Sequence, residues 1–248
     1  MDKLHGTVLC SISRNVFRIT SDKRHMSRKA RSVLPAVPHH VVLRGNNRRR
    51  LFSYPHEYER FIFLLGRRLI VGDCALHAAA LMTNHVHLVL TPATERALSS
   101  FVKTVAQRYA QMRNLARCGS GRLFEERYFS RPILSEQQLA VTIAYVELNP
   151  VRAGLASEPG AYRWSTFACH APSAGVGAIP RGLWRPTDWY LGLSSRADER
   201  EAAYRAWLDE CRARDERPDC SDQSDLRAAV ARLAAKVRVE RPDRSRAG

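Results

Sequence analysis

Two short apolar runs that lie close together in the chain constrain the fold most. Residues 74–82, "CALHAAALM", and residues 85–92, "HVHLVLTP", are separated by only two residues. Apolar runs of this length around so short a connection predict two neighbouring strands joined by a turn. The second run is unusual because it includes His85 and His87, two ionisable side chains in a segment that otherwise has the pattern of a buried strand.

Strand and helix patterns surround this pair in a regular order. The helix patterns are recognised by apolar residues at intervals of three and four, as in Phe61, Ile62, Leu65 and Leu69. In chain order we predict a strand at 38–44, a helix at 55–70, strands at 74–82 and 85–92, a helix at 95–115, a strand or extended segment at 122–134 and a helix at 135–149. This β-α-β-β-α-β-α order predicts an α+β fold, in which a ferredoxin-like βαββαβ antiparallel sheet carries one added helix.

The helix at 135–149 has recognisable ends and two distinct faces. Ser135 can cap its first turn, and Gln138 completes a capping box. Pro150 disfavours helical backbone at the residue before it, so we expect the helix to end near Asn149. One face is apolar. The other carries Gln138, Thr142, Tyr145 and Asn149.

The two histidines of the second apolar run are candidate metal ligands. His85 and His87 lie two residues apart, so in a strand both side chains point to the same face. Two imidazoles on one face can bind one metal ion, although a third ligand is needed to complete a site. The alternative is a pair of core histidines, each satisfied by its own hydrogen-bond partner. Structural roles are expected for His39, His40 and His77, which lack such an arrangement.

A tyrosine on the last of these helices is the candidate nucleophile. Tyr145 and Asn149 are four residues apart and are therefore neighbours on one helix face. Taken singly, Tyr145 would be an amphipathic core residue and Asn149 a helix cap. Together with the histidine pair and a basic chain, they indicate a nucleophile beside a metal ion that activates a phosphodiester. Tyr109 is the competing nucleophile, but its position on the apolar stripe of the helix at 95–115 predicts a place in the core.

The charge of the chain indicates a polyanionic partner. The 248 residues include 40 Lys and Arg against 24 Asp and Glu, which gives a formal net charge of +16. Nucleic acid is the simplest such partner, and the alternative is a basic protein from an Arg-rich genome. The six cysteines form no C-x-x-C pair, which argues against a zinc ribbon and against a disulfide framework. No run approaches 18 apolar residues, so we expect a cytoplasmic protein without a membrane span.

Arginines are concentrated in two segments that we expect to contact DNA. One surrounds the first turn, and the other precedes the helix at 135–149, where Phe124, Tyr128 and Phe129 are interleaved with arginines. Basic side chains that follow the phosphates and rings that stack on bases are typical of single-strand binding. The alternative is a strand whose aromatic residues face the core. The predicted DNA contacts are Arg44, Asn46, Arg48, Arg49, Arg122, Arg127 and Arg131.

Several phrases of the sequence together resemble one family of enzymes. "MTNHVHLVL" resembles the His-hydrophobic-His signature of the HUH single-strand nucleases. "YVELNPVRAGL", residues 145–155, resembles the tyrosine-helix motif of the REP-associated tyrosine transposases and their insertion-sequence relatives. "HHVVLRGNNRR", "GRLFEERYFS" and "YRWSTF" support the match, which covers about residues 37–170.

The resemblance implies a ferredoxin-like enzyme that cuts and rejoins single-stranded DNA. Tyr145, on the added catalytic helix, would attack the scissile phosphorus and form a 5′-phosphotyrosine intermediate. His85 and His87, with Asn149 as the third ligand, would hold Mg²⁺ or Mn²⁺. The implied substrate is single-stranded or hairpin-forming repeat DNA, such as REP elements, in a bacterial cytoplasm where the bound enzyme is associated with the nucleoid. Related folds occur as monomers and as dimers, so a homodimer is one expected assembly.

Three other functions are compatible with the same residues. The first is a non-catalytic or domesticated DNA-binding protein that keeps the fold. The second is a replication initiator or relaxase with the same His-x-His chemistry. The third is a hydrolytic metalloenzyme in which water is the nucleophile and Tyr145 only positions the substrate.

We expect the chain to divide into three parts. These are a basic, disordered N-terminal arm at 1–37, the transposase-like catalytic domain at 38–170, and a linker with a helical C-terminal extension at 171–248. Within the last part, Pro, Gly and Ser predict a linker at 171–195 with some Trp and Tyr anchors. Charged helical patterns follow at 196–215 and 222–238.

Overall fold

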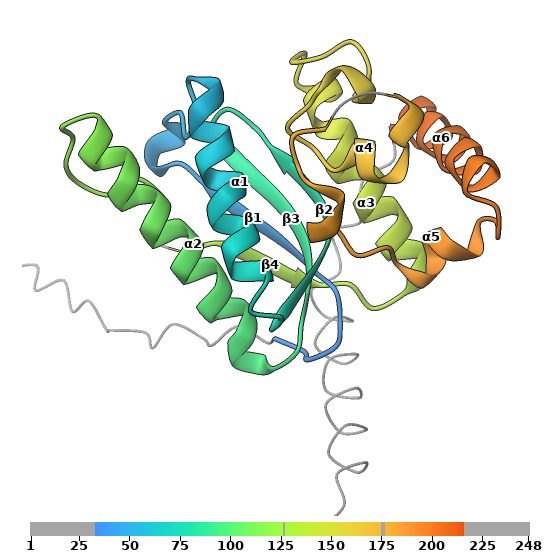
Figure 1. Cartoon of the computed structure of the whole chain (residues 1–248), viewed down its shortest axis with the longest axis horizontal. Coiled ribbons are helices and arrows are strands. Elements are labelled where there is room, and N and C mark those ends of the chain that lie inside the picture. The colour runs from blue at the N-terminus through green and yellow to red at the C-terminus, as the bar shows by residue number, and fades with distance from the viewer. Residues whose placement is uncertain (1–32, 126, 175–176, 216–248) are drawn as a thin grey trace, which may run out of the picture. The chain divides into compact units, whose positions relative to one another are not determined.

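The structure is built around a four-stranded antiparallel sheet (Figure 1). It is a computed structural model that describes residues 33–125, 127–174 and 177–215, all of which belong to one compact unit. The strands are β1 His39–Arg44, β2 Cys74–Leu81, β3 His85–Pro92 and β4 Phe129–Pro132. Their order across the sheet is β2-β3-β1-β4. The predicted ferredoxin-like sheet and the α+β class are confirmed.

Two helices, α1 Pro55–Leu69 and α2 Glu95–Ala116, cover one face of the sheet (Figure 1). Their buried residues recur at intervals of three and four and pack against Val41 and Leu43 of β1. Because side chains alternate along a strand, His40, Val42 and Arg44 point to the opposite face. The first core therefore leaves the other face of β1 for the candidate site.

The opposite face is covered by α3 Glu136–Arg152 and by elements that follow it in the chain (Figure 1). These elements are the short helices α4 Phe167–His170 and α5 Asp188–Gly192 and the longer α6 Ala197–Ala213. Ile143 and Val146 of α3 pack in a second core with Tyr204 of α6. α3 therefore contacts both the sheet and α6.

The Ser135 cap of α3 follows the prediction, whereas Gln138 bonds one residue before the cap and does not close the predicted capping box, and the end of the helix also differs. The Ser135 hydroxyl accepts a hydrogen bond from the Gln138 backbone N–H at 3.1 Å, and the Gln138 side chain accepts one from the Leu134 backbone N–H at 3.0 Å. The predicted end near Asn149 is wrong, because the helix continues through Pro150 to Arg152. Proline removes one N–H from the ladder but keeps a helical φ. The next carbonyls are satisfied, since Asn149 O accepts from the N–H of Ala153 at 2.9 Å.

The predicted strand at 122–134 is only partly a strand. β4 is limited to four residues, Phe129–Pro132, which pair antiparallel with β1. Upstream, Phe124 makes an isolated bridge with Gly45, and the Glu125 N–H donates to Arg44 O at 2.9 Å. The segment therefore follows β1 at the edge of the sheet, as Figure 1 shows for β4.

The stretch at 171–195, for which composition predicts a linker, is packed in the structure. Trp184 is buried, forms a parallel bridge with Leu76 of β2, and donates from Nε1 to His77 O at 2.8 Å. Tyr190 is also buried, and its hydroxyl donates to His170 O at 2.6 Å. The expected Trp and Tyr anchors thus fix this stretch against β2 and α4.

The helix predicted at 196–215 is present as α6. The predicted helix at 222–238 lies outside the described residues. Residues 1–32 of the predicted basic arm also lie outside them. Within the part of the chain that the structure describes, no helix is both long and apolar enough to cross a membrane.

A buried carboxylate joins α3 to the elements on its outer side. Glu147 has no exposed surface, and its carboxylate accepts hydrogen bonds from Thr166 Oγ1 at 2.6 Å, His170 Nδ1 at 2.9 Å and Tyr204 Oη at 2.6 Å. Burial, followed by the Glu147 charge, holds the pKa of Tyr204 well above its usual value, so the phenol stays a donor. The three donors offset the cost of burying this charge.

We expect Tyr204→Phe to lower the free energy of unfolding by about 1.5–3 kcal/mol, because it removes one of the three donors to a buried carboxylate. Urea unfolding followed by circular dichroism measures the change. Tyr54→Phe is the matched control, since Tyr54 is 57% exposed and should change stability by less than about 0.5 kcal/mol. Equal stability of the two variants would contradict the assigned role of the Tyr204 hydroxyl.

Candidate active site

The two histidines of β3 lie next to each other on the face that α3 covers. The ring centroids of His85 and His87 are 4.8 Å apart, with the rings nearly perpendicular. Nδ1 of His85 is 2.7 Å from Asn84 Oδ1, and Nδ1 of His87 is 3.0 Å from His40 Nε2. Because an amide oxygen can only accept, His85 donates from Nδ1 and keeps a lone pair on Nε2.

The Nε2 atom of His87 indicates where a ligand could bind in the site. It is buried, and no hydrogen-bond partner for it exists among the described residues. A buried polar atom without a partner is costly, and such atoms are rare in folded proteins. An imidazole nitrogen in this state is a fitting ligand for a cation.

All three imidazoles of this cluster are held in the neutral form that binds metals. Burial, followed by the Arg44 charge, lowers the pKa of His85 to about 4. Burial, followed by the Arg131 charge, lowers the pKa of His40 to about 4. The pKa of His87 lies well below its usual value, mainly through burial and then through His40. Neutral imidazole is the form that coordinates a metal ion at pH 7.

Tyr145 of α3 reaches this cluster from the opposite side. Its ring centroid is 5.8 Å from that of His87 and 5.9 Å from that of His40, both edge to face. The Arg152 guanidinium lies over the same ring, at 5.6 Å from the centroid. The competing Tyr109 is buried on the other side of the sheet, and its hydroxyl donates to Leu51 O at 2.8 Å. The structure thus brings Tyr145, and not Tyr109, to the histidines.

Tyr145 and His87 line one cavity of about 770 Å³. It lies between α3 and the strands β1, β3 and β4, and Gln138 and Thr142 of the polar stripe also line it. A cavity of this size is within the range of small-molecule sites and can accept a nucleotide unit.

Asn149 lies on α3 one helical turn beyond Tyr145. Its Nδ2 donates to the Tyr145 carbonyl at 2.8 Å, and it is half-buried outside the lining of the cavity. Because Nδ2 is engaged, Oδ1 is the amide atom left to bind a cation. Among the described residues, no three side chains of His, Cys, Asp and Glu are grouped to hold a metal. The predicted ligand set is of another kind, two imidazoles and one amide.

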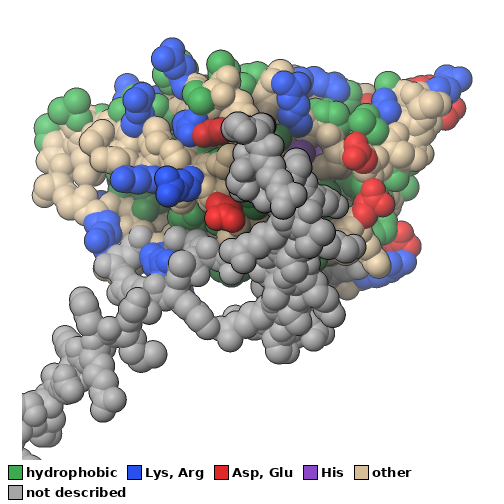
Figure 2. Space-filling view, turned by 90° about the horizontal axis from the view of Figure 1, so that it is seen from below, with side chains coloured by type: hydrophobic (Ala, Val, Ile, Leu, Met, Phe, Trp, Pro, Cys, Tyr) green, Lys and Arg blue, Asp and Glu red, His purple; other side chains and the backbone are tan. Residues whose placement is uncertain are grey.

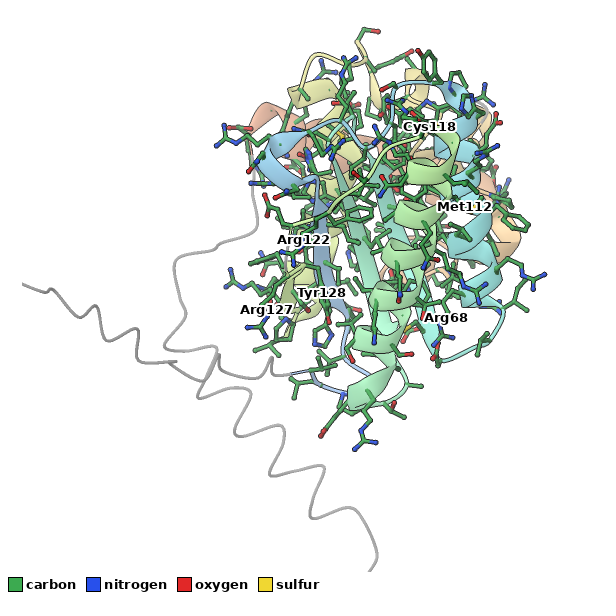
Figure 3. The ribbon with its side chains drawn as sticks, turned by 90° about the vertical axis from the view of Figure 1, so that its left-hand side faces the viewer. Arg68, Met112, Cys118, Arg122, Arg127 and Tyr128 are labelled. Carbon is green, nitrogen blue, oxygen red and sulfur yellow. The ribbon has the colours of Figure 1, made fainter. Side chains whose placement is uncertain are left out.

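The predicted DNA contacts fall into two groups. Arg44, Arg127 and Arg131 line the same cavity as Tyr145, so the structure gathers positive charge around the tyrosine. Arg122 lines a second cavity of about 580 Å³, which shares Arg44 and Arg127 with the first. Figure 3 shows Arg122, Arg127 and Tyr128 on one side of the molecule, where this segment passes.

The remaining predicted contacts lie in the first turn, outside the main cavity. Asn46 and Arg48 belong to a short 3-10 turn, and the Asn46 N–H donates to Leu123 O at 2.9 Å. Arg49 donates to Arg122 O at 3.4 Å, which joins the two arginine-rich segments. On the face drawn in Figure 2, Lys and Arg side chains are spread over the surface rather than gathered into one patch.

A match to a protein family covers the residues of this site. Residues 35–149 match the model of a protein family described as IS200-like transposases. This part of the chain is therefore similar to the IS200-like transposases. The IS200-like region contains His85, His87, Tyr145 and Asn149, and its last matched residue is Asn149 itself.

One solved structure supports the fold, and a second is less similar. One is a REP-associated tyrosine transposase bound to a REP hairpin, with 17% identity and a TM-score of 0.51, covering 64% of this chain and 89% of that one. Another, described as a transposase from Deinococcus radiodurans R1, has 19% identity and a TM-score of 0.35, covering 46% and 90%. At 17% identity the similarity to the REP-associated transposase shows the fold alone. No curated protein sequence matches this one significantly.

His40, for which a structural role is expected from the sequence, lies in the site. His39 and His77 have the expected structural roles, since both ring nitrogens of each make hydrogen bonds away from the cavity. His40 instead contacts His87 and Tyr145 inside the cavity. The place of His40 in the site could be predicted only from the pairing of β1 with β3, because this register places His40 diagonally across from His87.

Proposed function

We propose that this protein is a metal-dependent DNA transposase that cuts and rejoins single-stranded, hairpin-forming repeat DNA through Tyr145. Similarity to the IS200-like transposases supports transposase activity. The observation that carries the finer proposal is the approach of the Tyr145 ring to His87, whose buried Nε2 has no partner among the described residues. The REP hairpin bound by the similar solved protein supports a hairpin substrate.

In the cutting step, Tyr145 Oη attacks the scissile phosphorus and the bond from phosphorus to the 3′ oxygen breaks. The phenol proton passes to solvent, the leaving 3′ oxygen takes up a proton, and a 5′-phosphotyrosine remains on α3. The arginines that line the cavity hold the neighbouring phosphates, so the strand is oriented for in-line attack. A protonated phenol is a weak nucleophile, so attack requires stabilisation of the phenolate.

His85 and His87, with Asn149 as the proposed third ligand, would hold Mg²⁺ or Mn²⁺, which supplies positive charge beside a nonbridging phosphate oxygen. The lone pair on His85 Nε2 and the partnerless His87 Nε2 fit this role. In the joining step, the 3′-hydroxyl of another strand attacks the same phosphorus and releases Tyr145. The phosphodiester energy is conserved in the tyrosyl phosphate, so no ATP is needed.

The test is a covalent-adduct assay with labelled DNA. The full chain is incubated with Mn²⁺ and a single-stranded hairpin oligonucleotide that carries a label on the 5′ or the 3′ side of each candidate cleavage site. We expect an adduct that resists denaturant and carries only the 3′-side label, because tyrosine retains the 5′ phosphate. Perfectly duplex DNA should give little adduct. Tight DNA binding without any cleavage would instead support a non-catalytic DNA-binding protein.

The two outcomes of cleavage separate the remaining alternatives. Cleavage without an adduct would identify water as the nucleophile and exclude the proposed transesterification. An adduct that releases its DNA only when a second 3′-hydroxyl is supplied would support strand transfer over simple nicking. Tyr145 contacts His87 within one chain. Whether two chains associate, as in the predicted homodimer, is tested by sedimentation with and without DNA.

The cavity arginines give a prediction on binding. We expect the pair Arg127→Ala and Arg131→Ala to weaken single-strand binding for all sequences alike, and to reduce the slope of log K against log salt by about 0.7 for each lost phosphate contact. Fluorescence anisotropy at several salt concentrations measures both effects. Arg67→Ala is the control, because Arg67 is exposed on α1 beyond the other face of the sheet. An unchanged salt slope in the double variant would show that these two arginines do not contact DNA phosphates.

A further inference from the structure

His40 stands between the histidine pair and the tyrosine without a role in the proposed chemistry. It is half-buried on β1, and its ring is nearly parallel to that of His87, with centroids 5.2 Å apart and an angle of 16° between the ring planes. Its ring edge contacts Tyr145 at 5.9 Å and Phe129 at 6.0 Å between centroids. Its Nε2 is 3.0 Å from His87 Nδ1. These contacts from three elements fix the plane of the His40 ring.

We propose that His40 is a positioning residue that accepts a hydrogen bond from His87 and so directs the Nε2 lone pair of His87 toward the cation. This inference rests on the proposed function, because it assumes that His87 is a metal ligand. It concerns orientation alone, since His40 itself does not need to touch the metal or the DNA.

The direction of the hydrogen bond follows from the buried Nε2 atom. A bond between two neutral imidazoles needs one donor and one acceptor. If His40 were the donor, the proton of His87 would sit on Nε2, where the described residues offer no acceptor. A buried N–H without an acceptor is costly. If His87 donates from Nδ1, its Nε2 carries a lone pair, which a cation can satisfy.

The neighbouring histidine shows the same arrangement. His85 donates from Nδ1 to Asn84 Oδ1 at 2.7 Å, which leaves its Nε2 unprotonated. Each proposed ligand therefore has its own hydrogen-bond partner on the nitrogen away from the metal. Such outer partners fix the tautomer and the ring orientation of a ligating histidine, and their loss typically weakens metal binding by about 10–100-fold.

Two substitutions separate the hydrogen bond from the packing of the ring. His40→Phe keeps an aromatic ring against His87, Tyr145 and Phe129 but cannot accept a hydrogen bond. His40→Gln loses the ring but can place an amide oxygen near the position of Nε2. Mn²⁺ binding to the DNA-free protein is titrated by electron paramagnetic resonance of the free ion. We expect His40→Phe to weaken Mn²⁺ binding by about 10–100-fold and His40→Gln to retain most of the affinity.

His87→Ala distinguishes failure of this inference from failure of the proposed function. Loss of Mn²⁺ binding in His87→Ala together with wild-type binding in His40→Phe would overturn the role of His40 alone. Mn²⁺ binding by His87→Ala with the affinity of the unaltered protein would show that His87 is not a metal ligand. The tautomer of His87 in the unaltered protein gives a reading that needs no variant. Long-range proton–nitrogen NMR should find the proton on Nδ1, and a proton on Nε2 would overturn the inference.

Discussion

We expect Tyr145→Phe to abolish the covalent protein–DNA adduct and to slow strand cleavage by about 10⁴-fold or more. The substitution removes only the hydroxyl that would attack phosphorus. The ring keeps its edge contacts with His40 and His87 and its place under Arg152, so the fold and the shape of the cavity are preserved. Denaturing gel electrophoresis of labelled hairpin DNA after incubation with Mn²⁺ measures both adduct and cleavage.

Tyr109→Phe is the matched control for this prediction. It makes the same chemical change in the buried tyrosine on the other face of the sheet, where the hydroxyl donates to Leu51 O. It should lose about 1 kcal/mol of stability and still form the adduct. DNA binding of Tyr145→Phe should match that of the unaltered protein. If Tyr145→Phe forms the adduct at the normal rate, another residue is the nucleophile.

The second large effect is expected at His87, the more deeply buried of the two histidines proposed to hold the metal. His87→Ala should slow cleavage by about 10³-fold, because a bound cation contributes several kcal/mol to the transition state of phosphoryl transfer. Chelation of metal from the unaltered protein should have an effect of similar size. Mn²⁺ should restore the unaltered protein and leave His87→Ala inactive, because the ligand is missing. Cleavage rates are measured at saturating DNA with and without added Mn²⁺.

His77→Ala provides the control for a histidine removed from the same sheet. His77 lies on β2, and its ring bonds to Arg185 O and Thr91 Oγ1 rather than to the cavity. This variant should be less stable but should respond to Mn²⁺ as the unaltered protein does. Full Mn²⁺-dependent cleavage by His87→Ala would rule out a catalytic metal at this position.

Much of the fold can be predicted from local sequence patterns, because the spacing of apolar residues in each helix or strand indicates which of its faces is buried. The two apolar runs predict the β2–β3 hairpin, and the stripe of α3 predicts which side chains face the cavity. Three of the four residues of the polar stripe, Gln138, Thr142 and Tyr145, line it. Periodicity succeeds here because each element is long enough to show it.

Other features depend on contacts between distant segments and were therefore beyond local patterns. The position of His40 depends on the register between β1 and β3, which no single strand encodes. Trp184 and Tyr190 are isolated anchors among Pro, Gly and Ser, so their burial leaves no periodic trace. The passage of α3 through Pro150 is stabilised by its surroundings, against the local preference of the residue before proline.

The buried carboxylate on α3 bears on how short a working version of this protein can be. Every residue proposed for cutting DNA lies at or before Asn149, where the family match ends. The three donors to Glu147 come from Thr166, His170 and Tyr204, all beyond that point. A fragment cut at the family boundary would retain the complete set of proposed reactive groups, yet it would lose the core that packs against α3 and all three donors to Glu147, two positions from the proposed nucleophile. The functional boundary of the enzyme therefore extends at least to α6, more than fifty residues past the last reactive side chain.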